Sequence, residues 1–297
     1  MPKWMTKLAS FHVSSSPLQL SFIGILILCV TSLVRILFRL LKGKLFYRVN
    51  NNNLALDPLE FRSFRLIEKA VVTPNVRLFR FAASHPEQLV NVPLGKHIYA
   101  RAWINGKEVR RPYNPINKPN QVGGCFDILV KIYPAPYGLF SRYLDSLKDG
   151  DCVEFRGPKG KFEYQRNMKK RLGMIAGGTG ITPMYQLIET ILNDPLERTQ
   201  ISLIYANHTE QDIIFRNKLE SFASQFPNRL KLYFVLNQPP NSWSQGIGLI
   251  NEKHIQHHIG YASPSTRILV CGPPAMTKAM MILLNKLGYK GEDIFKF

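Results

Sequence analysis

The chain has 297 residues, a formal net charge of +19 at pH 7 and four cysteines, so it is long enough for about two globular domains. The positive charge favours an acidic partner or an anionic surface. No zinc-ligand spacing or RNA-binding aromatic motif accompanies it, which argues against nucleic-acid binding. The cysteines are scattered without CxxC pairs, which argues against a structural metal site and favours reduced thiols in the cytosol.

The N-terminal region carries no Asp or Glu before Asp57. Residues 1–17 are predicted to be a tail, and residues 18–41 a transmembrane anchor, because the first seventeen residues of that segment are uncharged and mostly apolar. Seventeen helical residues span about 25 Å, and snorkelling of Arg35 and Arg39 would extend the span. Two basic residues precede the uncharged run at 18–34 and five follow it, so the positive-inside rule places the C-terminal part in the cytosol.

A cleaved signal peptide is the alternative interpretation of this segment. Residues 35–48 offer no A-x-A-like cleavage site, which favours the anchor. The endoplasmic reticulum and the mitochondrial outer membrane both remain open as its location. Residues 42–60 are predicted to link the anchor to the globular part, with membrane lipid as a partner of the anchor.

Residues 61–168 show the short, alternating apolar runs that are typical of β-strands. We expect strands at 61–72, 76–82, 97–104, 125–133 and 152–156, and one helix at 139–147. Turn signals such as Asn105-Gly106 and Asp149-Gly150 separate the runs. The pattern predicts an antiparallel six-stranded β-barrel, an architecture that removes exposed sheet edges by closure.

From residue 169 to residue 297 the periodicity changes, because apolar runs now alternate with helical stretches. We expect strands at 172–176, 201–206, 230–236 and 268–271, and helices at 183–192, 212–226 and 274–287. This alternation predicts an α/β domain with a doubly wound parallel sheet. Ligands of such sheets bind beyond the carboxyl ends of the strands.

Two turns rich in glycine and proline fall at these strand ends, Gly-Gly-Thr-Gly at 177–180 and Cys-Gly-Pro-Pro at 271–274. Glycine exposes the backbone and a following helix attracts anions, so the first turn suits a flat or phosphorylated ligand. An ordinary strand-to-helix turn is the alternative. No GxGxxG motif follows the first strand of this region, so the common dinucleotide-binding fingerprint is absent.

Six motifs follow one another in a set order along the chain. They are RPYNP at 111–115, GLFS at 138–141, GPKG at 157–160, GGTGITPM at 177–184, CGPPAM at 271–276 and FKF at 295–297. In this order they resemble the ferredoxin-NADP reductase superfamily, and most closely the NADH-cytochrome b5 reductases, over about residues 61–297. The resemblance implies an FAD-binding barrel at 61–168, an NADH-binding domain at 169–297, and electron transfer from NADH through FAD to cytochrome b5.

The resemblance also implies which residues contact FAD. Arg111 would hold the pyrophosphate, which suits a guanidinium, Tyr113 would pack on the isoalloxazine, and residue 114 would lie near flavin N5. The other implied FAD positions are Pro112, Leu129, Lys131, Tyr133, Gly138, Leu139, Phe140, Ser141 and Thr182. In isolation, Arg111 is also compatible with a surface ion pair and Ser141 with a plain helix N-cap.

Asn114 departs from the family, which usually has Thr or Ser at this position. An amide can also donate a hydrogen bond, but it is longer and differently placed. We hypothesise that FAD binding survives while the flavin potential or the hydride-transfer rate is altered.

The implied NADH contacts are Gly178, Thr179, Gly180, Asn237, Cys271, Gly272, Pro273, Pro274, Met276 and Phe297. No metal and no acid-base residue are implied, because hydride passes directly between the two cofactors. NADH-selective members commonly carry an acidic residue where this chain has Asn237, which neither repels a 2′-phosphate nor clamps it. We expect NADH to be preferred over NADPH, with a weaker preference than in those members.

The electron acceptor is implied to be cytochrome b5, an acidic haem protein. A basic stretch that ends in Lys169, Lys170 and Arg171 is a candidate docking surface, and a solvated loop is the alternative. The same architecture also serves other acceptors, such as a quinone or a ferric chelate. A membrane-tethered nucleotide-binding sensor without useful turnover is the alternative from another class.

Overall fold

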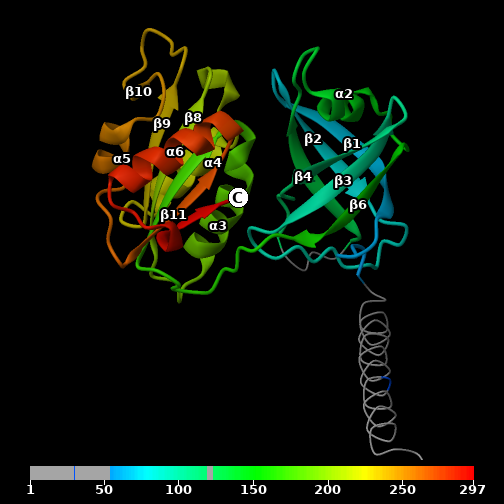
Figure 1. Ribbon diagram of the computed structural model, residues 1–297, viewed down its shortest axis with the longest axis horizontal. Helices are drawn as coiled ribbons and strands as arrows, with labels where there is room; N and C mark the ends of the chain where they lie inside the picture. Colours follow the sequence, from blue (N-terminus) through cyan, green and yellow to red (C-terminus); the bar gives the residue numbers. More distant parts are fainter. Residues whose placement is uncertain (1–29, 31–53, 119–122) are drawn as a thin grey trace, which may run out of the picture. The chain divides into compact units, whose positions relative to one another are not determined.

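The computed structural model describes residue 30, residues 54–118 and residues 123–297 (Figure 1). Apart from Val30, the anchor predicted at 18–41 lies outside the described residues, as do the tail at 1–17 and the first part of the linker. Within the described part of the chain, no helix combines the length and the apolar character that a membrane span needs.

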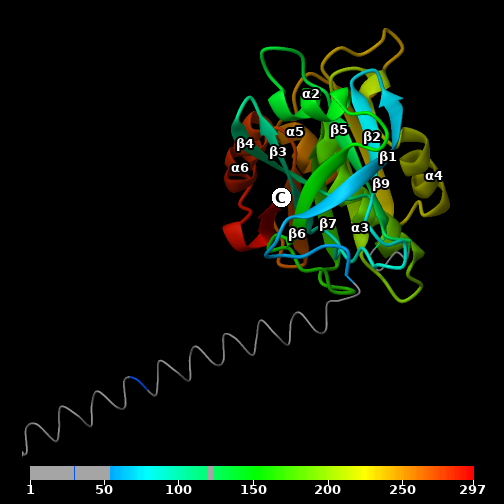
Figure 2. The same cartoon turned by 90° about the vertical axis from the view of Figure 1, so that its right-hand side faces the viewer.

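The first described part of the chain forms a six-stranded antiparallel sheet, as predicted. Its strands, in spatial order, are β4 (Lys107–Tyr113), β3 (His97–Ile104), β6 (Cys152–Lys159), β1 (Arg62–Thr73), β2 (Val76–Ala82) and β5 (Cys125–Lys131). Figure 2 shows the curved sheet with α2 (Leu139–Ser146) at one end. Among the described residues no ladder joins the edge strands β4 and β5, so hydrogen bonds do not close the barrel.

Strand β4 is the one strand of this sheet that the sequence pattern did not predict. Its residues are mostly charged, and most are exposed, because it is an edge strand that does not need an apolar face. It pairs with β3 through a hairpin in which Asn105 and Gly106 have φ angles of 52° and 72°. Asn-Gly is the preferred dipeptide of such hairpins, so the turn signal already noted in the sequence pointed to this strand.

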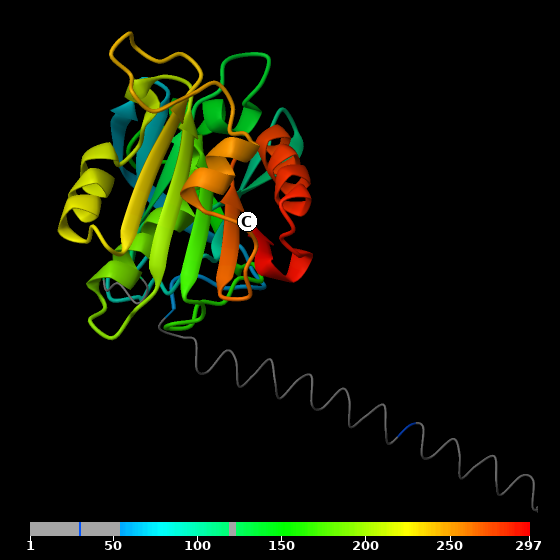
Figure 3. The same ribbon diagram turned by 90° about the vertical axis from the view of Figure 1, so that its left-hand side faces the viewer.

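The second part forms the predicted parallel sheet. Its strands, in spatial order, are β10 (Gly246–Ile247), β9 (Leu230–Leu236), β8 (Gln200–Asn207), β7 (Arg171–Gly177), β11 (Thr266–Cys271) and β12 (Ile294–Lys296). One face packs against α3 (Ile181–Asn193) and α4 (Arg216–Gln225), and the other against α5 (Glu252–His258) and α6 (Pro274–Lys286) (Figure 3). Three short 3₁₀ helices complete it, η1 (Gly178–Gly180), η2 (Glu210–Asp212) and η3 (Gly291–Asp293).

Two helix starts differ from the prediction. Helix α3 begins at Ile181, two residues before Pro183, because the glycine turn winds directly into the helix. Helix α4 begins at Arg216 and not at residue 212, because Phe215 adopts a left-handed φ of 59°. Helix α5 and strands β10 and β12 are short, and the periodicity of the sequence did not predict them.

The two sheets are in direct contact. Val76 and Leu129 from the barrel belong to the same buried cluster as the apolar side chains of α3 and β8. Two hydrogen bonds also join the sheets: Asn75 donates to Asp212 at 2.6 Å, and Gln186 of α3 donates to the carbonyl of Asn117 at 2.9 Å. The loop after β4 is therefore held against the helix that follows the glycine turn.

The last residues of the predicted linker pack against the barrel. Ala55 and Leu56 are buried in the barrel core, and Leu54 forms a β-bridge with Leu89. Arg62 of β1 donates to the carbonyl oxygen of Leu54 at 2.5 Å. Residues several positions before the first strand thus already pack against the barrel.

A buried carboxylate, Glu197, fastens the segment between the two sheets. It accepts hydrogen bonds from the Tyr164 hydroxyl, from the Asn167 N–H at 2.9 Å, and from the Thr199 hydroxyl at 2.7 Å. Burial acts to raise the pKa of Glu197, but these hydrogen bonds outweigh it and hold the pKa at about 2. The segment around residue 165 is therefore anchored to the loop that follows α3.

Replacing Glu197 with glutamine is expected to lower the free energy of unfolding by about 1–3 kcal/mol, because buried donors lose an ionised acceptor. The pKa of Glu197 is lower in the folded than in the unfolded chain. The ionised carboxylate therefore stabilises the fold fully above about pH 4.5, and this stabilisation is lost as the pH falls toward 2. Denaturant unfolding at pH 7, 5 and 4 should show a smaller decline for Glu197→Gln than for the unmodified chain. Parallel declines would contradict this role.

Candidate functional site

Two turns meet at the carboxyl edge of the parallel sheet. A Cβ on Gly180 would come within 2.3 Å of the Cys271 carbonyl oxygen, and one on Gly177 within 2.5 Å of the Met276 sulfur. Gly178 has a φ of 53° and nothing within 4 Å of its missing Cβ. The turns therefore touch backbone to backbone, while Gly178 leaves its own backbone open to a ligand.

The barrel meets this edge through strand β5, which contacts η1. Leu129 of β5 is buried in the shared apolar cluster, so its side chain packs between the sheets. Thr182 is also buried, and its hydroxyl donates to the Thr179 carbonyl at 3.0 Å. The predicted FAD positions on β5 and the predicted NADH positions in the glycine turn are thus brought together.

Arg111 and Tyr113 lie on the barrel edge strand β4. The Arg111 guanidinium donates to the Arg110 carbonyl at 2.8 Å, and within the described residues it forms no ion pair. Arg110, next to it, pairs with Glu108 instead. Tyr113 packs against Phe140 at a centroid distance of 6.2 Å, and burial raises the pKa of its phenol. An uncommitted guanidinium beside an aromatic ring fits the phosphates and the ring of a flavin nucleotide.

Asn114 follows at the end of β4, and its side-chain amide donates to the Lys96 carbonyl at 2.9 Å. The next residue back, Gly95, lies against the rings of Phe162 and Phe297, because a Cβ there would come within 3.0 Å of both. Phe297 also donates its N–H to the Val270 carbonyl at 3.0 Å. Residue 114 and the aromatic C-terminal residue therefore share one region, and the amide nitrogen of Asn114 is already engaged.

The turn into α2 holds further predicted FAD positions. Gly138 is left-handed, with a φ of 66°, and a Cβ there would collide with Tyr133 and Ser141. The buried Ser141 hydroxyl donates to the Gly138 carbonyl at 3.0 Å and accepts from the Tyr133 N–H at 3.2 Å. Ser141 therefore orders the turn with its hydroxyl. Phe140 is buried in the barrel core, whereas Tyr133, Leu139 and Pro112 are exposed and Lys131 is half-buried.

The opposite wall comes from the start of α6. Gly272 and Met276 are half-buried, and Pro273 and Pro274 are exposed. Burial raises the pKa of the Cys271 thiol to about 12, so the thiol stays protonated at neutral pH and is a poor nucleophile. Asn237 lies two strands away from β7, about 10 Å by the strand spacing, and its N–H donates to the Asn207 carbonyl at 3.2 Å.

Tyr205, which holds the glycine turn in place, was not predicted from the sequence. Tyr205 is fully buried on β8, and its hydroxyl donates to the Gly178 carbonyl at 3.0 Å. It lies inside an apolar run, where a tyrosine is indistinguishable from a core residue. The hydrogen bond from Asn114 to the Lys96 carbonyl could not be predicted either, because every residue has a backbone carbonyl.

The basic residues proposed for docking lie elsewhere on the sheet. Arg171 begins β7, six residues before Gly177, which is about 20 Å along a strand. Lys169 donates to the Pro264 carbonyl at 2.7 Å and lies 3.5 Å from Asp293. Lys170 and Arg171 are exposed. The structure therefore places this stretch at the amino edge of the sheet, away from the two turns.

Comparisons with known proteins match both sheets to nucleotide-binding domains. Residues 63–164 match the oxidoreductase FAD-binding domain, and residues 174–281 match the oxidoreductase NAD-binding domain. NADH-cytochrome b5 reductase 1 of Dictyostelium discoideum is 46% identical over 243 residues, which cover 82% of this chain and 84% of the relative. The Debaryomyces hansenii protein of the same name is 41% identical over 261 residues, 85% of this chain and 91% of the relative.

A solved structure extends the likeness to three dimensions. The cytochrome b5 reductase domain of Ulva prolifera nitrate reductase superposes with a TM-score of 0.75 at 37% identity, covering 82% of this chain and all of that domain. The uncovered share of this chain is smaller than either matched domain, residues 63–164 or residues 174–281, so the match extends over part of both.

Proposed function

We propose that this chain, which belongs to the NADH-cytochrome b5 reductase family, transfers electrons from NADH through FAD to cytochrome b5. The observation that carries the proposal is the meeting of β5, η1 and the Cys271 turn, because it joins an FAD-binding sheet to an NAD-binding sheet at one edge. We also propose 61–168 and 169–297 as the extents of the two domains.

When bound, FAD would accept two electrons from NADH and release them singly, which is what a one-electron haem acceptor requires. The chain's own task is to bind, orient and shield. The open backbone of Gly178, supported by Tyr205, would receive the nicotinamide end of the dinucleotide. The buried, protonated Cys271 would line the same cleft without covalent chemistry.

The FAD contacts that we propose follow the same geometry. Arg111 would bind the pyrophosphate, Tyr113 would pack on the ring system, and Thr182 would approach the flavin from α3. The remaining proposed contacts are the FAD and NADH positions given above from the resemblance. Their support is that α2 contacts β4, and that β5 contacts η1, whose turn lies against the Cys271 turn.

Rapid mixing of the FAD-loaded full chain with NADH, followed by cytochrome b5, tests the proposal. Fast bleaching of the flavin and subsequent haem reduction are expected. Bleaching without haem reduction, together with reduction of a quinone or ferric chelate, would move the assignment to a different acceptor. A flavin that NADH does not bleach would reject enzyme function and leave the nucleotide sensor.

Asn114→Thr is expected to leave the FAD content unchanged and to lower the flavin potential by about 20 mV. One N–H of the Asn114 amide is held by the Lys96 carbonyl, which fixes the direction of its second N–H, whereas a threonine hydroxyl could rotate to donate to oxidised flavin N5. One hydrogen bond is worth about 1 kcal/mol, or ~20 mV for a two-electron couple. Potentials measured by dye equilibration should show the difference. Identical potentials and turnover in the two proteins would reject the hypothesis.

NADH is expected to be preferred over NADPH in kcat/KM, and Asn237→Asp is expected to widen that preference about tenfold. A carboxylate there would repel a 2′-phosphate, and one repulsion of about 1.4 kcal/mol is a factor of ten. Steady-state kinetics with both nucleotides measure the ratio. The exposed neighbour Gln238, converted to glutamate, serves as the charge-matched comparison. A native preference for NADPH would overturn the expectation.

We propose that residues 18–41 anchor the enzyme in the endoplasmic reticulum or mitochondrial outer membrane, with the folded part in the cytosol. Detergent-free fractionation of the full chain against a chain that begins at residue 54 tests the anchor.

We further propose that cytochrome b5 docks near Lys169, Lys170 and Arg171. Lys170→Gln/Arg171→Gln should then weaken the salt dependence of haem reduction, and the same change at the exposed Lys107 should not.

A further inference from the structure

A groove lies on the α5 face of the parallel sheet, near the strands' amino ends. It is about 340 Å³ in volume, and its floor comes from β7, β8 and β9. Helix α5 is only seven residues long and covers the sheet no further than Ile259, which packs over Gly173. Polar side chains, including Gln200, Ser202 and Lys231, therefore occupy positions that a longer helix would have kept apolar. This groove is separate from the site where the two turns meet.

The groove is positively charged without compensation. Its lining includes the cations Arg171, Arg229 and Lys231, with His257 and His258 beside them, and it contains no Asp or Glu. Arg229 is engaged with the carbonyls of Ile191 and Thr199. Within the described residues, by contrast, the side chains of Arg171 and Lys231 have neither an ion-pair nor a hydrogen-bond partner. Unpaired cations in a concave site concentrate positive potential and favour an anion.

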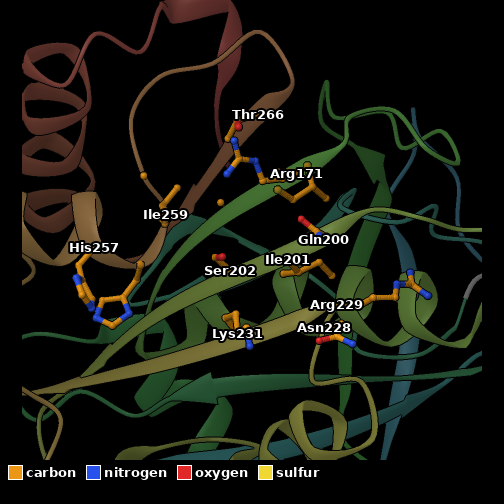
Figure 4. A pocket seen from close by; sticks show the side chains of 14 residues that line it. Arg171, Gln200, Ile201, Ser202, Asn228, Arg229, Lys231, His257, Ile259 and Thr266 are labelled. Carbon is orange, nitrogen blue, oxygen red and sulfur yellow. The ribbon is translucent and has the colours of Figure 1, made fainter.

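The arrangement of the donors indicates the kind of anion. Figure 4 shows Arg171 and Thr266 on one side of the hollow, Lys231 on the other, His257 on the α5 side, and Ser202 between them. Lys231 lies two strands and two register positions away from Arg171, about 12 Å between backbones, so their long side chains can converge on one or two phosphate groups. Such groups offer several acceptor oxygens to a guanidinium and an ammonium at once.

A second, independent observation concerns Thr266, whose side chain is 98% buried, since its relative exposure is 2%. Its hydroxyl has no hydrogen-bond partner among the described residues, although the residue lines the groove. A buried hydroxyl without a partner costs about 1–3 kcal/mol. A phosphate oxygen held by the adjacent Arg171 would supply the missing acceptor.

We propose that this groove binds a phosphorylated small molecule, with Arg171, Lys231 and His257 as its ligands and Ser202 and Thr266 as neutral donors. A neighbouring cavity of about 560 Å³ shares His257 and His258 and adds Tyr233 and Tyr261, again without a carboxylate. Tyr233 stacks on His258 at a centroid distance of 3.6 Å. The aromatic side chains give room for the organic part of the ligand beside its phosphate.

Calorimetric titration of the FAD-loaded full chain with pyrophosphate, at constant ionic strength, tests the proposal. Saturating NAD⁺ keeps the probe out of the nucleotide cleft. One pyrophosphate per chain is expected, with a Kd that rises at least tenfold in Lys231→Glu and in Arg171→Gln. Lys107→Glu, an equal change of charge on the distant strand β4, should leave the Kd unchanged. No binding to the unmodified chain, or equal weakening by Lys107→Glu, would overturn the proposal.

Hydrogen exchange on the unmodified chain gives a readout that does not depend on how the variants fold. Pyrophosphate should slow amide exchange in residues 228–233 and 254–260 and leave residues 177–182 unaffected. Protection at 177–182 alone would place the probe in the nucleotide cleft and would reject the groove as its site.

Discussion

Arg111→Gln is expected to raise the Kd of FAD about ten- to a hundredfold. A hydrogen bond to a charged group contributes about 1.5–3 kcal/mol, and each 1.4 kcal/mol is a factor of ten. The guanidinium forms no ion pair within the described residues, and its hydrogen bond goes to the carbonyl of the adjacent Arg110, so its loss removes a ligand contact without breaking a contact to another element. Arg111→Lys should recover only part of the affinity, because an ammonium lacks the two-pronged geometry. Fluorescence of released flavin during dilution measures the Kd.

The adjacent residue provides the matched control. Arg110 lies on the same strand and carries the same charge, but its guanidinium pairs with Glu108 and lies 5.3 Å from the Phe61 ring. Arg110→Gln should therefore leave the FAD affinity within about twofold of the original, as expected for a weak exposed ion pair. Equal FAD loss from both variants would mean that net charge, and not the Arg111 contact, holds the cofactor.

Gly180→Ala is expected to separate the two turns. Gly180 has an ordinary helical φ of −63°, so alanine meets no backbone strain there, but its Cβ would lie 2.3 Å from the Cys271 carbonyl oxygen. Overpacking against backbone costs about 1–3 kcal/mol. If half of that cost appears in NADH binding, KM rises about two- to tenfold. Thermal unfolding and the KM for NADH, measured on the same preparation, should both change.

Gly291 is the control for this substitution, because it also lies in a 3₁₀ helix and has nothing within 4 Å of its missing Cβ. Gly291→Ala should change neither the unfolding midpoint nor the KM. Should Gly180→Ala behave like Gly291→Ala, the close approach of the two turns would have no functional weight.

Much of the fold could be predicted because its signals are local. Alternating runs indicated five barrel strands, and the change of period at residue 169 indicated the parallel sheet. Strand β4 was not predicted because an edge strand needs no apolar face. Helix α5 was not predicted because seven residues are too few to show a helical period. Helix α4 begins later than expected because Phe215 has a left-handed backbone conformation. Phenylalanine rarely adopts this conformation, and no residue pattern predicts it.

The candidate site likewise contains some residues that the sequence indicates and others that it does not. Glycine turns and the RPYNP motif are readable, because they place unusual residues where a ligand approaches. The contacts that hold these motifs in place cannot be predicted from the sequence. Tyr205 holds Gly178 and the Lys96 carbonyl holds Asn114, and both contacts join residues far apart in the chain through groups that any core or loop contains. Their discovery needed the tertiary structure.

The burial of Ala55 and Leu56 has a mechanical consequence. A pulling force applied at Leu54 would reach the barrel core through these two side chains and β1 through the Arg62 contact with Leu54. A fragment cut at Asp57 would leave the places of both side chains in the core empty. Fragments that begin at residue 54 or earlier should hold their flavin on heating to higher temperatures than fragments that begin at Asp57.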